Sequence, residues 1–184
     1  QGAQVPLADG YADTPAINTP GGLYERPLEG EGAVTISVPL NSVVRYTLDG
    51  TDPTAESPIY TEPIEIEKNT VLRARSYREG VEASMVVSQT YLFSTYHTMP
   101  VICITTDPDH LWNEENGMFA YGPNVDINQP TPWFKYATYG QKNWYGGWVE
   151  YYDEAGTQQF SQGMTFRVMG QYSLDMPQKS LYIQ

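Results

Sequence analysis

The sequence predicts a mainly β fold, made of an antiparallel sandwich followed by a second, smaller β-rich module. The first observation is the composition, with 15 Tyr and 4 Trp in a hydrophilic chain of mean hydropathy -0.45. Tyr and Trp suit half-buried strands because each joins an apolar body to a polar tip. The second is the content of 16 Gly and 14 Pro, which favours short strands and many turns.

The third observation is the pattern between residues 33 and 93. Alternating or apolar segments occur at 33–38, 44–48, 64–66, 71–77 and 84–93. Turn-forming pairs such as Asp49-Gly50, Lys68-Asn69 and Glu79-Gly80 separate them. Short strands at this spacing predict a small antiparallel sandwich over residues 22–94. Residues 1–21 lack apolar periodicity and are predicted to be a linker or the tail of a preceding module.

The second module is predicted at 97–184. It opens with an apolar strand at 101–105, continues through a loop-rich segment from 106 to 146, and has strands at 148–152 and 164–169. A final strand begins at Ser180, and a helical turn is expected near 108–113. Because the chain starts at Gln1 and stops within a strand-like pattern, we expect an excised piece of a longer, multidomain protein.

The net charge of the chain limits the classes of binding partner that we expect. The net charge is -12 and no basic stripe exists, so neither nucleic acid nor an anionic membrane surface is expected to bind. No apolar stretch approaches the roughly 20 residues of a membrane helix, so no membrane insertion is expected. The one cysteine, Cys103, lies in an apolar run and is interpreted as a small buried hydrophobe rather than a reactive thiol.

A motif in the first module carries a family resemblance. Residues 46–53 read YTLDGTDP, and Tyr60, 70–74 (TVLRA) and Gly80 follow. This pattern resembles the small domain at the C-terminus of chitobiase and β-hexosaminidases, which recurs in secreted bacterial proteins. The resemblance implies an immunoglobulin/fibronectin-III-like antiparallel sandwich and an extracellular or cell-surface location in bacteria. Asp49 and Asp52 are interpreted as turn-forming residues, with a metal site as the alternative.

Motifs in the second module carry another resemblance. They are 99–112 (MPVICITTDPDHLW), 116–119 (NGMF), 149–153 (VEYYD), 166–170 (FRVMG) and 177–180 (PQKS). In this order they are similar to the CotH (spore coat protein H) kinase-like family. The resemblance implies that 97–184 is the truncated, β-rich N-terminal portion of an atypical protein kinase. ATP and Mg or Mn are implied only for the full-length parent, whose metal-holding carboxylates would follow this portion. Leu174 stands where family members usually have Arg.

Two basic residues are the candidates for nucleotide contact. Lys179 is predicted to meet nucleotide phosphates as a point charge, and the alternative is a solvated or carboxylate-paired lysine. Arg167 is predicted to support it through an ion pair with Asp175 or Glu150. No catalytic residue and no cofactor are expected within the chain itself.

Asp107 and Asp109 are weak candidates for a metal site. Their spacing with Asn113 and Glu115 is similar to that of calcium loops, but the glycine falls at 117. We therefore expect the two aspartates to cap a helical turn that begins at Pro108.

Aromatic residues between 133 and 148 are the last candidates. Trp133, Trp144 and Tyr145 lie in a Gly-rich stretch and could stack on sugars as a glycan-binding platform. The alternative, which we favour, is that these aromatics form the small core of the loop, with Trp148 packed under the sheet.

Together these features predict a non-catalytic scaffold and recognition fragment of a secreted bacterial CotH-family protein. Its expected partners are other domains of the parent chain and a protein substrate or cell-surface glycan. The alternative is a carbohydrate-binding or adhesion module of a cell-surface protein.

Overall fold

The computed structural model describes residues 10–93, 98–123, 125, 126, 128, 143–170 and 178–184. These residues are mainly β, which confirms the predicted fold class. The strands are β1 (Ala16–Ile17), β2 (Gly22–Tyr24), β3 (Ile36–Ser37), β4 (Val43–Thr47), β5 (Thr70–Tyr77), β6 (Val87–Phe93), β7 (Val101–Thr105), β8 (Tyr145–Tyr152), β9 (Gln158–Met169) and β10 (Ser180–Ile183). Helix is confined, in the described part of the chain, to η1 (Gly30–Gly32) and α1 (Pro108–Trp112), and neither is long enough to cross a membrane.

The chain divides into two compact units. The first contains Gln1–Cys103 and Glu150–Gln162, and the second contains Ile104–Val149 and Gly163–Gln184. β8 therefore contributes residues to both units. The module boundaries expected at 22–94 and 97–184 stay predictions.

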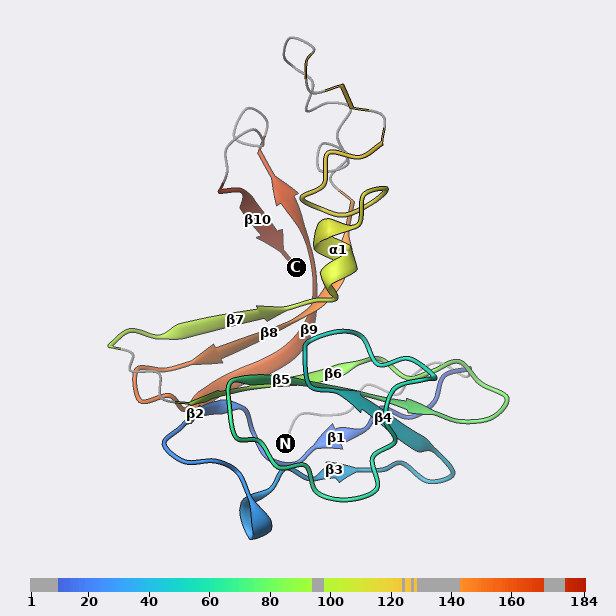
Figure 1. Ribbon diagram of the computed structural model, residues 1–184, viewed down its shortest axis with the longest axis vertical. Helices are drawn as coiled ribbons and strands as arrows, with labels where there is room; N and C mark the ends of the chain where they lie inside the picture. Colours follow the sequence, from blue (N-terminus) through green and yellow to red (C-terminus); the bar gives the residue numbers. More distant parts are fainter. Residues whose placement is uncertain (1–9, 94–97, 124, 127, 129–142, 171–177) are drawn as a thin grey trace. The chain divides into compact units, whose positions relative to one another are not determined.

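The first unit contains a sandwich of two sheets (Figure 1). The larger sheet has the order β2-β6-β5-β4, in which β5 pairs antiparallel with both neighbours and β2 pairs parallel with β6. The smaller sheet joins β1 to β3, with Ile17 opposite Ile36. Single bridges from Leu28 to Ile66 and from Val34 to Ile64 extend the pairing.

The core of this sandwich forms from the alternating positions of its strands. Strand alternation turns every second side chain inward, and Leu72 and Ala74 on β5 are fully buried in this way. The other buried members are Leu28, Val34, Ile36, Val44, Ile64, Ile66, Tyr91 and Phe93. Ile17 and Tyr24 pack against this cluster, so β1 and β2 belong to the same core.

The second unit has its own apolar cluster. Within this unit β9 pairs antiparallel with β10, and Arg167 lies opposite Tyr182. Even-numbered residues of β9, namely Met164, Phe166 and Val168, are buried together with Val149 and Met118. Leu111 and Phe119 pack against this cluster from the segment around α1.

Two segments differ from the sequence-based expectation. β1 lies within 1–21, the predicted linker, and Tyr11 also bridges to Glu82, so Tyr11, Ala16 and Ile17 pair with the sandwich. A strand of two residues carries no detectable alternation, which explains why the pattern did not indicate it. β9 begins at Gln158 rather than at 164. The sequence pattern did not indicate residues 158–163 because they are mostly polar and lack a buried alternating face.

The sandwich core gives a first prediction. Leu72→Ala removes a fully buried side chain and should lower the free energy of unfolding by about 3 kcal/mol, as a cavity-forming truncation does. Leu40→Ala is the matched control, because Leu40 is 81% exposed and its loss should change stability by less than about 0.5 kcal/mol. Chemical denaturation of both variants measures the difference, and equal values would show that Leu72 does not lie in the core.

Candidate functional site

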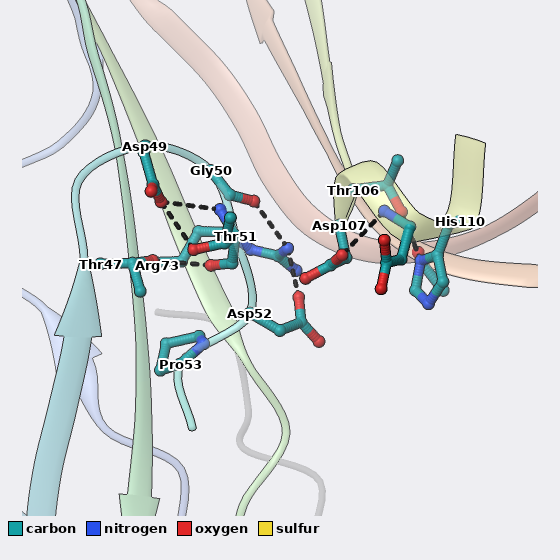
Figure 2. A network of polar contacts seen from close by, with 12 residues as sticks. Thr47, Asp49, Gly50, Thr51, Asp52, Pro53, Arg73, Thr106, Asp107 and His110 are labelled. Carbon is teal, nitrogen blue, oxygen red and sulfur yellow. Dashed lines mark hydrogen bonds and ion pairs between the residues drawn. The ribbon is translucent and has the colours of Figure 1, made fainter. Parts of the chain in front are cut away.

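The loop after β4 is held by its own polar residues (Figure 2). The Asp49 Oδ1 atom accepts hydrogen bonds from the Thr51 backbone N–H at 3.1 Å and from the Thr51 hydroxyl at 2.6 Å. These bonds lower the pKa of Asp49, because they favour its ionised form. Gly50 has a φ of 85°, a left-handed conformation that glycine adopts without strain. The predicted turn role of Asp49 is confirmed.

A buried arginine closes the same loop. Arg73 on β5 is 4% exposed, donates to the Gly50 carbonyl oxygen at 3.1 Å and forms an ion pair with Asp52. A buried cation needs such partners, since burial removes the water that would otherwise solvate it. The Tyr77 hydroxyl adds a hydrogen bond to the Pro53 carbonyl oxygen at 2.8 Å. These contacts hold the loop in its conformation, which explains why residues 49–53 (DGTDP) include polar side chains.

Asp107 caps the short helix α1 of the second unit (Figure 2). Its Oδ1 atom accepts the Asp109 backbone N–H at 2.9 Å, and Pro108 occupies the first helical turn. The predicted helical turn and its cap are confirmed, with Asp109 as the acidic residue of that turn. Among the residues described, no three His, Cys, Asp or Glu side chains gather in one place.

A buried carboxylate is the most unusual polar group of the first unit. Glu150 is 0% exposed and lies beside β6. Thr90 donates to it twice, from its backbone N–H at 3.0 Å and from its hydroxyl at 2.5 Å. The Tyr152 hydroxyl and the Gln158 amide donate to its Oε1 atom at 2.7 and 3.2 Å. Four donor groups therefore replace the water that Glu150 has lost.

Burial shifts the acidity of this Glu150 network, which we define as Glu150, Thr90, Tyr152, Gln158 and Gln89. Burial raises the pKa of Glu150, and the hydrogen bonds from Thr90 and Tyr152 oppose that shift only in part. Burial and the nearby Glu150 carboxylate also raise the pKa of Tyr152. Burial, with a smaller effect of Glu150, raises the pKa of the Cys103 thiol to about 11, so Cys103 is a poor nucleophile at neutral pH.

The Glu150 network reaches the start of β2. The Gln158 amide donates to the Gln89 Oε1 atom at 2.8 Å, and the same oxygen accepts the Gly21 backbone N–H at 2.6 Å. A Cβ atom at Gly21 would lie 2.6 Å from both the Thr90 carbonyl oxygen and the Tyr152 hydroxyl. The network therefore requires glycine at this position.

The second unit carries a cation between two aromatic rings. The guanidinium carbon of Arg167 lies 5.0 Å from the Trp144 ring centroid and 5.5 Å from that of Tyr182. The two rings meet edge to face, with centroids 5.6 Å apart. Trp144 is 47% and Tyr182 44% exposed, so the cluster of Trp144, Arg167 and Tyr182 faces solvent. Arg167 thus packs by cation–π contact, and Glu150, one of its two expected ion-pair partners, is engaged elsewhere.

The remaining predicted residues are placed separately. Tyr145 is half-buried and makes contacts within the unit. Its hydroxyl donates to the Asn116 carbonyl oxygen, and its ring lies 5.4 Å from that of His110. Trp148 on β8 is half-buried, and its expected packing under the sheet stays a prediction. Lys179 is half-buried and directly precedes β10. Trp133, Leu174 and Asp175 lie outside the described residues.

Sequence reasoning missed two members of these clusters. No sequence pattern singles out Tyr182, although it lies directly opposite Arg167 in the β9–β10 register. The sequence predicts Glu150 only as an ion-pair partner of Arg167. The available signal was a glutamate alternating with aromatics in the strand-like run Trp148–Tyr152, since a carboxylate on an inward face must be paired.

Comparison with known proteins assigns part of the chain. Residues 34–91 match the family model described as "Fn3 associated", so this part is an Fn3-associated β module. The match covers the DGTDP loop and most of the sandwich, and it lends no support to the CotH resemblance of the second module. Neither the curated proteins nor the solved structures give a match to this chain.

The loop geometry predicts a modest role for Asp49 in stability. Asp49→Ala removes both hydrogen bonds to Thr51 and should lower the free energy of unfolding by about 1 kcal/mol. Asp49→Asn keeps the Oδ1 acceptor and should lose less. Denaturant midpoints at constant slope measure both variants, and an Asn variant as unstable as the Ala variant would contradict this assignment.

The Glu150 network predicts a pH dependence. Because the folded-state pKa of Glu150 is raised, the native state binds this proton more tightly than the unfolded chain. The stability that protonated Glu150 contributes is fully present below its ordinary pKa of 4.5, and it is lost as pH rises through the higher pKa of the folded state. Glu150→Gln removes the titration, so the stability of the native protein relative to this variant should fall as pH rises above 4.5. A difference that stays constant with pH would contradict the shift.

A second substitution separates charge from hydrogen bonding. In Glu150→Gln, the new side-chain amide could accept from the Thr90 N–H and donate to the Thr90 hydroxyl, whereas Glu150→Ala leaves buried donors without acceptors. Glu150→Ala should therefore cost about 3 kcal/mol or more, and more than Glu150→Gln. Thermal or denaturant unfolding at one pH measures both, and equal losses would show that the hydrogen bonds at Glu150 contribute little.

Proposed function

We propose that the chain is a non-catalytic scaffold and recognition module of a secreted bacterial surface protein. The observation that carries this is the closed state of the Glu150 network. A general acid or base must come within about 3 Å of its substrate, whereas Glu150 is 0% exposed and surrounded by its own donors. The most deeply buried carboxylate of the described residues is thus used to hold the fold together.

The match of residues 34–91 to the Fn3-associated family supports the scaffold part of the proposal. Asp52 and Arg73 form the ion pair of that module, and Asp49 is bonded to Thr51. Each of these charged groups therefore has a structural role. The extracellular or cell-surface location is proposed on the sequence resemblance to secreted bacterial domains, and other domains of the parent chain are proposed as its first partners.

The parent protein is proposed to belong to the CotH kinase-like family. The support is the order of five motifs between residues 99 and 180. In that interpretation Lys179 would contact nucleotide phosphates, and ATP with Mg or Mn would bind only when the metal-holding carboxylates of the parent are present. A protein substrate would then be a partner of the parent rather than of this chain.

A carbohydrate-binding or adhesion role is the second candidate. It is favoured by one observation, the exposure of Trp144 and Tyr182 on either side of Arg167. Exposed rings held on a strand or at a strand end can stack on sugar faces without losing much conformational freedom. The two candidates are compatible, because a scaffold can present a recognition surface.

The scaffold proposal predicts that this chain transfers no phosphoryl group. Incubation with labelled ATP, Mg²⁺ or Mn²⁺ and a general protein acceptor should give only background incorporation, since a positioned metal and an acceptor-orienting group are both needed. Lys179→Ala should leave that background unchanged. Incorporation above background that Lys179→Ala abolishes would overturn the proposal and place a complete active site within the chain.

A further inference from the structure

The cluster of Trp144, Arg167 and Tyr182 is built by strand pairing in the second unit. Tyr182 on β10 lies directly opposite Arg167 on β9, so both side chains leave the same face of the sheet. Trp144 immediately precedes β8 and places its ring 5.0 Å from the guanidinium carbon. Arg167 and Tyr182 therefore sit on strands and Trp144 at a strand end, which holds their geometry in the absence of a ligand.

Arg167 keeps unused hydrogen-bonding capacity. Its Nε atom is buried, and the described residues offer it no hydrogen-bond partner. The ion pairs found in the described part of the chain involve Arg73 and Arg78 and leave Arg167 out. Aromatic faces attract a cation, but they accept none of the five N–H groups in the way a carboxylate does. Among the described residues, the Arg167 guanidinium thus has two aromatic contacts and no ion pair that would neutralise its charge.

Ring exposure adds a second kind of contact. Trp144 and Tyr182 are each nearly half exposed although both are large aromatics. The apolar face of a pyranose can stack on such a ring, and a guanidinium fork matches a carboxylate through two parallel hydrogen bonds. One sugar that bears a carboxylate would satisfy both groups at once.

The charge of the chain limits the ligand further. With a net charge of -12, the protein repels polyanions at long range, whereas one carboxylate within an otherwise neutral glycan avoids most of that repulsion. We propose that Trp144, Arg167 and Tyr182 form a binding site for a sugar residue that carries a single carboxylate, such as a uronic acid. This inference rests on the recognition half of the proposed function and names its ligand class.

The test compares two ligands that differ only in the carboxylate. The probes are a xylo-oligosaccharide that bears one glucuronic acid and the same oligosaccharide bearing neutral glucose at that position, each titrated calorimetrically into the full chain. The native protein should bind the acidic probe about tenfold more tightly, as one charge-assisted bidentate contact allows. Acetate is added as a competitor to distinguish recognition of the whole acidic sugar from recognition of a carboxylate alone. If the site recognises only a carboxylate, acetate should displace the probe at millimolar concentration.

Variants test each group. Trp144→Ala should weaken binding of both probes about tenfold, since sugar stacking and the cation–π contact are both lost. Arg167→Gln should abolish the preference for the acidic probe, and Arg167→Lys should retain only part of it because the ammonium lacks the fork. Trp112→Ala is the matched control, because Trp112 is 63% exposed in the same unit and its ring packs at a tilt against Phe119. Its affinities should equal those of the native protein, and unchanged melting temperatures show that each variant is folded.

Several outcomes would overturn the inference. They are equal affinity for the two probes, a preference that survives Arg167→Gln, full displacement by acetate, or no binding by the native protein at millimolar probe. None of these results bears on phosphoryl transfer, which is measured separately with ATP. Failure of this site is therefore distinguishable from failure of the scaffold proposal.

Discussion

The hydrogen bond from the Thr90 backbone N–H to Glu150 is the contact on which the organisation of the first unit depends. β2 pairs with β6 only along Tyr91–Phe93, so the N–H of Thr90, one residue earlier, lies beyond the end of that pairing. Glu150 supplies the missing acceptor at 3.0 Å, although it lies sixty residues further along the chain. A buried backbone donor and a buried carboxylate are each costly alone, and together they satisfy one another. Residues 150–162 are thereby attached to the sandwich by polar contacts, which are directional and allow little sliding.

Close packing reinforces this attachment through two glycines. A side chain at Gly21 would collide with the Thr90 carbonyl oxygen, the Tyr152 hydroxyl and Gln89. Gly156, in the turn between β8 and β9, has a φ of 79°, and a Cβ atom there would lie 2.8 Å from Leu23. The start of β2 therefore touches residues 150–162 at positions where only hydrogen atoms fit. The Glu150 network and these contacts constrain the same interface within the unit, so a change in either one disturbs the other.

Strands within longer strand-like segments could be predicted from sequence more readily than the shortest ones. β5, β6 and β7 follow the expected segments closely, because the segments 71–77, 84–93 and 101–105 are each an alternating or apolar run of at least five residues. β1 and β2 have two and three residues and owe their existence to pairing partners elsewhere in the chain. The difference between local and long-range contacts also decides which site residues could be predicted from sequence. The Asp49 and Asp107 turns are local and were predicted, whereas the partners of Glu150 and Arg167 depend on tertiary contacts that no spacing reveals.

Arg73 and Arg167 differ in the partners that meet their positive charge. Arg73 is 4% exposed, and its charge is met by Asp52 and by the Gly50 carbonyl oxygen inside the Fn3-associated module. A ligand carboxylate would have to displace a partner that is already in place, at the cost of leaving a buried group unpaired. Arg167 lies outside the matched residues and is flanked by exposed rings, so a ligand would add contacts without breaking an ion pair in the described part of the chain. The residues that match the Fn3-associated model thus hold their arginine in a structural ion pair, and the sugar site that we propose lies on strands that follow them.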